Sequence, residues 1–154
     1  MDFINLFITF SGRINRAKFW IAVLVFTAIN IVMAGLVYAT DGSTPAQIVN
    51  GLVSLAVFIS GIGVGIKRLH DRNKSGWYLL LFYLAPSVLF TAGYILGMTE
   101  GGETIGGVLA FLSLAIMVWA FVELGCLRGT IGQNRFGPDP LAPEVLTPPV
   151  RTHA

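Results

Sequence analysis

Four long runs of uncharged, mostly apolar residues constrain this chain more than any other feature of its sequence. They cover residues 19–39, 48–66, 77–98 and 105–127, and only Glu123 interrupts the last of them. A helix of about 20 apolar residues crosses the roughly 30 Å hydrocarbon core of a bilayer. Only 12% of the residues are charged, against about 25% in soluble domains. The pattern therefore predicts an all-α membrane protein, a bundle of four transmembrane helices.

The distribution of positive charge predicts how the chain is oriented. The 10 Lys and Arg residues all precede the first run, lie between the second and third runs, or follow the fourth. The other two loops, "TDGSTPAQ" and "TEGGET", carry acidic residues and no basic ones. Because Lys and Arg accumulate in cytoplasmic loops, we expect both termini to be cytoplasmic.

The segments outside the four runs are short. Phe3, Leu6, Phe7 and Phe10 recur at helical spacing, which predicts a short N-terminal helix at the membrane interface, with part of its apolar face free to pack on the spans. We expect residues 1–140 to form a single integral membrane domain. The proline-rich residues 141–154 are expected to form a disordered tail.

The predicted spans contain glycines at spacings typical of helix contacts and one internal proline. Gly61 and Gly65, and also Gly93 and Gly97, have the spacing that lets helices approach closely in lipid. Pro86 is expected to kink the third span and to leave a backbone carbonyl without its usual donor. The single cysteine, Cys126, excludes an internal disulfide framework.

Glu123 is the acidic group inside the fourth run, and two interpretations of it stay open. Ionisable groups in membranes are candidate ion or proton sites. Glu123 also lies near the predicted cytoplasmic end, where it could form a structural ion pair. We favour the ion pair, with the basic partners Lys67, Arg68 or Arg128.

Three polar segments share the predicted cytoplasmic side: "FSGRINRAKFW" (residues 10–20), "KRLHDRNKSGW" (residues 67–77) and "RGTIGQNRFGPDP" (residues 128–140). Their ordered motifs, F-x-G-R-x-x-R, then R-L-H-D, then G-x-N-R-F-G-x-D-P, resemble a family of small bacterial inner-membrane proteins, domain of unknown function 805 (DUF805). The resemblance implies a multi-pass protein of the bacterial inner membrane and brings no established activity. Its characteristic positions here are Gly12, Arg13, Arg16, Trp20, Arg68, Leu69, His70, Asp71, Trp77, Gly132, Asn134, Phe136, Gly137, Asp139 and Pro140.

We expect the three segments to converge into one structured cytoplasmic cap, because charge placement alone does not require the accompanying Gly, Asn, His, Asp and Pro. In this cap Arg13, Arg16 and Arg68 would pair with Asp71 and Asp139. A planar guanidinium can also bind a phosphate through two parallel hydrogen bonds. The predicted ligand is an anionic phospholipid headgroup or a partner protein. The candidate anion-binding residues of the cap are Arg13, Arg16, Arg68, His70, Asp71, Asn134, Arg135 and Asp139.

Enzymatic function is disfavoured, because no nucleophile accompanies His70 and its neighbour Asp71. The few His and carboxylate side chains of the cap are too sparse for a metal site, and we expect no cofactor and no nucleic-acid partner. The alternative function is a small transporter or channel component, forming a homo-oligomer or joining another membrane protein, that uses Glu123 and the Pro86 kink.

Overall fold

The structure, a computed structural model, describes residues 3–142. The predicted proline-rich tail lies outside the described residues from position 143 onward. The described chain is helical: α1 (Phe3–Ile8), α2 (Arg16–Ala39), α3 (Thr44–Asp71), α4 (Tyr78–Gly97), α5 (Glu103–Phe121) and a short π-helix, η1 (Val122–Cys126). Four helices are long and apolar enough to cross a membrane. The predicted all-α membrane fold with four spans is confirmed.

The long helices begin and end where local chemistry dictates. The side chain of Asn15 accepts a hydrogen bond from the backbone of Lys18 (2.9 Å) and so caps the first turn of α2. At the other end of the first hairpin, α3 extends past the apolar run and ends only at Asp71, followed by Asn73 in the left-handed region (φ 56°). The 28 residues of α3 measure about 42 Å, so its last turns extend beyond the hydrocarbon core.

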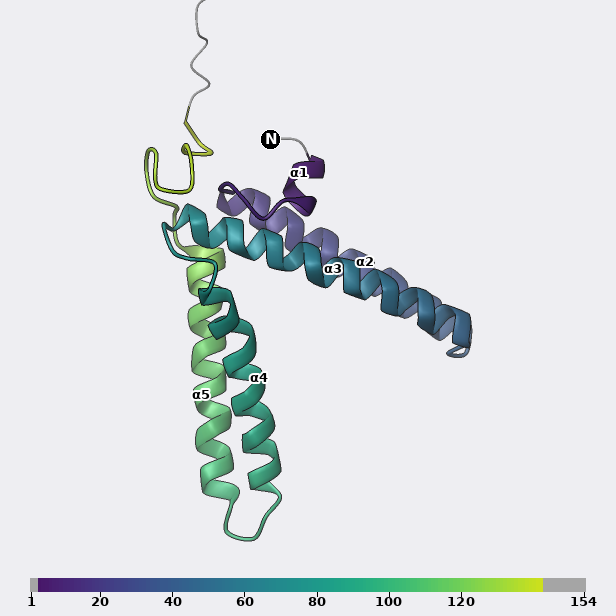
Figure 1. The fold of residues 1–154 in the computed structure, drawn as a ribbon. Coiled ribbons are helices and arrows are strands. Elements are labelled where there is room, and N and C mark those ends of the chain that lie inside the picture. The colour runs from purple at the N-terminus through teal and green to yellow at the C-terminus, as the bar shows by residue number, and fades with distance from the viewer. Residues whose placement is uncertain (1–2, 143–154) are drawn as a thin grey trace, which may run out of the picture.

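The four spans form two hairpins, α2 with α3 and α4 with α5, that diverge from one end of the molecule (Figure 1). The three polar segments lie together at this shared end, and the two connecting loops lie at the far tips of the hairpins. The buried apolar clusters also lie toward the shared end, where Leu69 packs with Leu79 and Phe82. Away from it, large apolar side chains on the spans are exposed, as lipid-facing positions should be.

Two glycine contacts set how closely the helices approach. A Cβ on Gly93 of α4 would lie 2.8 Å from the carbonyl oxygen of Gly106 on α5, and a Cβ on Gly65 would lie 2.7 Å from Leu79. The backbones at Gly93 and Gly106 therefore touch directly. Across the same pair of helices, Ser113 donates a hydrogen bond to the carbonyl of Pro86 (2.9 Å).

The N-terminal helix α1 is packed on the first hairpin. Leu6 is buried with Ile14, Ala22 and Val64. The buried ammonium of Lys67 donates hydrogen bonds to the last carbonyls of α1, including that of Asn5 (2.9 Å), a favourable position for a cation. Part of the apolar face of α1 thus packs on the spans, while Ile4 and Ile8 on the same helix stay exposed.

Candidate functional site

The candidate site lies in the cap, which consists of the three polar segments at residues 10–20, 67–77 and 128–140. Backbone hydrogen bonds join its three segments, from Ile14 N–H to the carbonyl of Lys67 (3.4 Å) and from Thr130 N–H to the carbonyl of Asp71 (2.8 Å). Every Lys and Arg of residues 3–142 belongs to the cap. Segments that are far apart in the sequence therefore meet at one end of the molecule (Figure 1).

One carboxylate, that of Asp71, serves two guanidinium groups in the cap. Arg13 donates to Oδ1 through Nε (3.2 Å) and Nη2 (3.1 Å), and Arg68 donates to Oδ2 through Nη1 (2.6 Å). All three side chains are at least 97% buried. Because two positive charges surround one negative charge, this cluster carries a net positive charge.

The remaining donors of Arg13 and Arg68 bind the backbone of the chain that leaves α5. A Cβ on Gly129 would overlap the Asp71 carboxylate, so glycine is required where this chain passes Asp71. Arg13 donates to the carbonyls of Thr130 (2.6 Å), Gly132 (2.7 Å) and Gly137 (3.2 Å), and Arg68 donates to those of Leu124 (2.7 Å) and Leu127. These bonds give both guanidinium groups a structural role.

The imidazole of His70 is held in a stack. Its ring lies parallel to that of Phe136, with the centroids 3.8 Å apart, and Nδ1 lies 3.2 Å from the carbonyl of Gly12. A carbonyl can only accept a hydrogen bond, so Nδ1 carries the proton. The side chain of Asn134 donates to the carbonyl of His70 (2.9 Å) and to Thr130 Oγ1 (2.9 Å). His70 and Asn134 thus fasten the last segment of the cap to the end of α3.

Asp139 and Arg135 lie at the margin of the cap. The Asp139 carboxylate accepts from the backbone N–H groups of Gly132 (3.0 Å) and Leu141 (2.9 Å), and these bonds hold its pKa below the usual range. Its expected pairing with an arginine is not seen among the described residues, because a short acidic side chain in a turn reaches its own backbone first. Arg135 donates to the carbonyl of Asn73 (3.1 Å).

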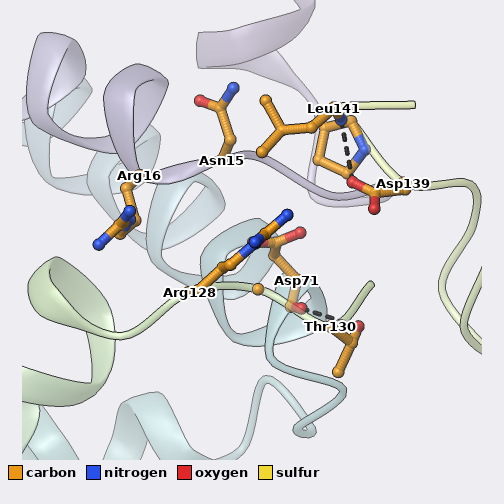
Figure 2. Close-up of a pocket in the computed structure, with 9 residues that line it drawn as sticks. Asn15, Arg16, Asp71, Arg128, Thr130, Asp139 and Leu141 are labelled. Atoms are coloured by element: carbon orange, nitrogen blue, oxygen red, sulfur yellow. Dashed lines mark hydrogen bonds between the residues drawn. The ribbon is translucent and has the colours of Figure 1, made fainter. Parts of the chain in front are cut away.

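A cavity of about 180 Å³ opens within the cap. Figure 2 shows the start of α2, the end of α3 and the chain after η1 arranged around it. Its lining combines cationic, acidic and backbone groups: Asn15, Arg16, Asp71, Arg128, Gly129, Thr130, Asp139, Pro140 and Leu141.

Arg16 and Arg128 supply the cavity with cations that have no carboxylate partner among residues 3–142 within 4.0 Å. Both side chains are exposed. Arg16 donates one hydrogen bond, to the carbonyl of Cys126 (2.9 Å), and so keeps other donors available. The charge of Asp71 is already compensated by its two arginines, and the one remaining carboxylate of the lining, that of Asp139, opposes two cations, so the lining carries a net positive charge.

The carboxylate of Glu123 is buried and bound on both oxygens. Arg72 Nε and Lys74 Nζ each lie 3.0 Å from it. The ion-pair interpretation thus fits the structure, although the partners differ from those expected. Lys67 is engaged by α1 and Arg68 by Asp71, whereas the turn at Asn73 returns Lys74 toward η1.

Sequence reasoning missed two contributors to the site. The sequence predicts Arg128 only as a partner for Glu123 and predicts no role for Thr130, whose N–H and hydroxyl both donate to the carbonyl of Asp71. Arg128 is the first residue of the third polar segment, which was the available signal. Among residues 3–142, no three His, Cys, Asp or Glu side chains gather where they could hold a metal ion.

Four helices able to span a bilayer, tied at one end by a buried arginine–aspartate cluster, define a small multi-pass membrane protein. The family of proteins of unknown function DUF805 matches residues 7–138, and the chain belongs to this family. The family resemblance predicted from the three motifs is confirmed.

Relatives of the chain occur in Escherichia coli (strain K12). It is 28% identical to the inner membrane protein YhaH over 87% of this chain and 88% of that protein. It is 31% identical to the uncharacterized protein YiiR over 85% of each chain, and 26% identical to the inner membrane protein YhaI over 87% of each. No solved structure matches the chain. The chain is thus a multi-pass protein of the inner membrane.

Proposed function

We propose that this protein is a non-enzymatic membrane protein whose cap binds the phosphate of an anionic phospholipid at the cytoplasmic surface. One observation carries the proposal: Arg16 and Arg128 line a cavity in which no described carboxylate pairs with them. A guanidinium presents two parallel donors to a phosphate. Basic groups near an anionic leaflet gain about 1 kcal/mol each.

The buried cluster of Asp71, Arg13 and Arg68 supports this proposal because it fixes the shape of the cavity. Asp71, Arg13 and Arg68 hold the chain after η1 against the end of α3. Arg128 lies on that chain and Arg16 lies on α2, so the distance between the two cations depends on this cluster. Two cations carried by backbone segments that are already held together lose less conformational entropy on binding than cations on two independently moving segments do. The proposal therefore divides the cap into a structural group and a binding pair, of which Arg16 was a predicted anion-binding residue and Arg128 was not.

The transporter alternative receives less support. It requires Glu123 to be available to an ion or a proton, and both oxygens of that carboxylate already have cationic partners. A buried carboxylate between two cations is what a structural ion pair would present.

The proposal is tested with the purified full-length chain and dioleoyl phosphatidylglycerol, with dioleoyl phosphatidylcholine as the neutral lipid. Native mass spectrometry measures how many lipids each protein retains. We expect the wild type to prefer phosphatidylglycerol, and the double variant R16Q/R128Q to lose this preference by about tenfold. R135Q is the matched control for each single variant, R16Q and R128Q, since each of the three removes one charge from the cap and Arg135 does not line the cavity.

Two results would overturn the proposal. If R135Q lost as much preference as R16Q and R128Q each do, the attraction would be diffuse and not a property of the cavity. If the wild type showed no preference for phosphatidylglycerol, and cross-linking to a second membrane protein depended on Arg16 and Arg128, the cap would be a protein-docking site.

A further inference from the structure

We infer that the acyl region of the same phospholipid lies in an apolar groove between α2 and α5, directly beside the cap cavity. This inference rests on the proposed function, because it assigns the hydrocarbon of the ligand whose phosphate occupies the cavity. The groove has a volume of about 270 Å³. Its lining comes from α2, α5 and η1: Phe19, Trp20, Val23, Ala120, Phe121, Leu124 and Gly125.

The groove offers no free polar group to a ligand. The indole Nε1 of Trp20 is the one side-chain polar atom in its lining, and it donates to the carbonyl of Gly125 (3.1 Å). The Trp20 ring packs edge-on against Phe121, with the centroids 5.8 Å apart. Glycine is needed at 125, because a Cβ there would lie 2.8 Å from the Trp20 ring. The surface is thus shaped for hydrocarbon.

The helix α2 connects the groove to the cavity. Arg16, Phe19, Trp20 and Val23 are spaced at i, i+3, i+4 and i+7 and therefore share one face of α2. Arg16 lines the cavity, and the other three line the groove. On the opposite wall, η1 supplies Gly125 to the groove and leads into Arg128 of the cavity. One ligand can therefore place an anion above and an apolar chain below along these two walls.

The position of the groove favours a lipid over other anions. The α2–α3 and α4–α5 hairpins diverge below the cap (Figure 1), so the groove lies where the two apolar hairpins begin to separate. A free phosphate would occupy the cavity alone, whereas a phospholipid matches both the charge above and the hydrocarbon surface below. The charge and polarity of the two sites together match an anionic phospholipid, with its phosphate in the cavity and an acyl chain in the groove.

The inference predicts that filling the groove weakens lipid retention without removing the anion site. Val23→Trp places a large ring in the groove. Val25→Trp is the matched control, because Val25 lies on the same helix, is exposed and lines neither site. Binding of dioleoyl phosphatidylglycerol by native mass spectrometry should fall about tenfold in V23W and stay unchanged in V25W. Glycerol 1-phosphate, which carries the phosphate without acyl chains, should bind V23W and the wild type equally.

The outcomes separate the two proposals. If V23W retained phosphatidylglycerol like the wild type, or if glycerol 1-phosphate bound the wild type as tightly as the lipid, the groove assignment would be wrong while the anion site stood. If R16Q/R128Q kept full binding of both probes, the proposed function itself would fail, and the groove assignment with it.

A second measurement avoids the risk that V23W does not fold. Wild-type protein is photolysed with phosphatidylglycerol that carries a diazirine on its acyl chain, and the labelled peptides are sequenced. We expect the label within residues 19–23 and 120–125. Label confined to the outer faces of α3 or α4 would refute the inference.

Discussion

Asp71 is the residue on which the cap depends most. Its carboxylate is almost fully buried and is shared by Arg13 (3.1 Å) and Arg68 (2.6 Å). Isolated surface ion pairs contribute little to stability, but a buried charge that loses its partner is costly. Here two cations depend on one anion, and their other donors hold the chain that follows η1. The loss of a single negative charge would therefore affect all three segments.

We expect Asp71→Asn to lower the free energy of unfolding by about 3 kcal/mol, because it leaves two buried guanidinium groups without a counter-ion. The measurement is an SDS titration of protein in bicelles, followed by circular dichroism. Asp41→Asn is the matched control: Asp41 is exposed, and its positive φ (50°) suits asparagine. Its effect should stay within about 0.5 kcal/mol. Equal stability of the two variants would show that the cluster contributes no net stability.

At the scale of the helix, the contact between α4 and α5 depends on glycine. A Cβ on Gly106 would lie 2.6 Å from the carbonyl oxygen of Gly93 and 2.8 Å from the Cα of Gly97. Lipid is as apolar as a helix surface, so close van der Waals packing must hold these helices together. The spacing of Gly93 and Gly97 predicted a close approach of α4. Its partner Gly106 is not among the predicted contacts, although Gly102 and Ala110, four residues before and after it, give the same small-residue spacing.

Neighbouring glycines on α5 allow a controlled test of this contact. Gly106→Ala should lower the free energy of unfolding by about 1–3 kcal/mol, because the helices must separate to admit the methyl group. Gly107→Ala changes the same residue type one position on, where a Cβ meets nothing within 4 Å, and should have an effect within about 0.5 kcal/mol. The same SDS titration measures both variants. A loss in G107A that matched the loss in G106A would place the cause in the helix itself and not in the contact.

At the scale of the whole molecule, hydropathy predicted the four spans but not how they are grouped. Lipid-facing and helix-facing positions are equally apolar, so the sequence does not mark which faces meet. A run of uncharged residues ends at Ile66, but α3 continues to Asp71. A helix continues as long as its backbone hydrogen bonds form, whatever the hydropathy of its residues. This continuation places Arg68 and Asp71 one turn apart. The convergence of the polar segments was predicted, whereas the roles of Arg128 and Lys74 depend on turns that residue type does not reveal.

The position of every described Lys and Arg in the cap leads to a prediction of topology. Neither hairpin tip carries a basic residue, so the positive-inside rule puts the tips outside and the cap inside. The test uses single cysteines in a Cys126→Ser background, which removes the exposed native thiol. An impermeant maleimide applied to intact spheroplasts should label Ser43→Cys and Glu100→Cys at the tips. It should label Ser75→Cys and Gln133→Cys in the cap only after permeabilisation.

The comparison between Ser75→Cys and Gln133→Cys decides the outcome of this experiment. Thr130 N–H bonds to the carbonyl of Asp71, and Arg135 bonds to the carbonyl of Asn73 (3.1 Å), so Ser75 and Gln133 belong to segments in direct contact. They must respond alike, whichever side of the membrane they occupy. If both were labelled in intact spheroplasts, the cap would face outward and would meet a different lipid leaflet. If only one were labelled, the chain would cross the bilayer an odd number of times between them, and the Asp71 cluster could not form.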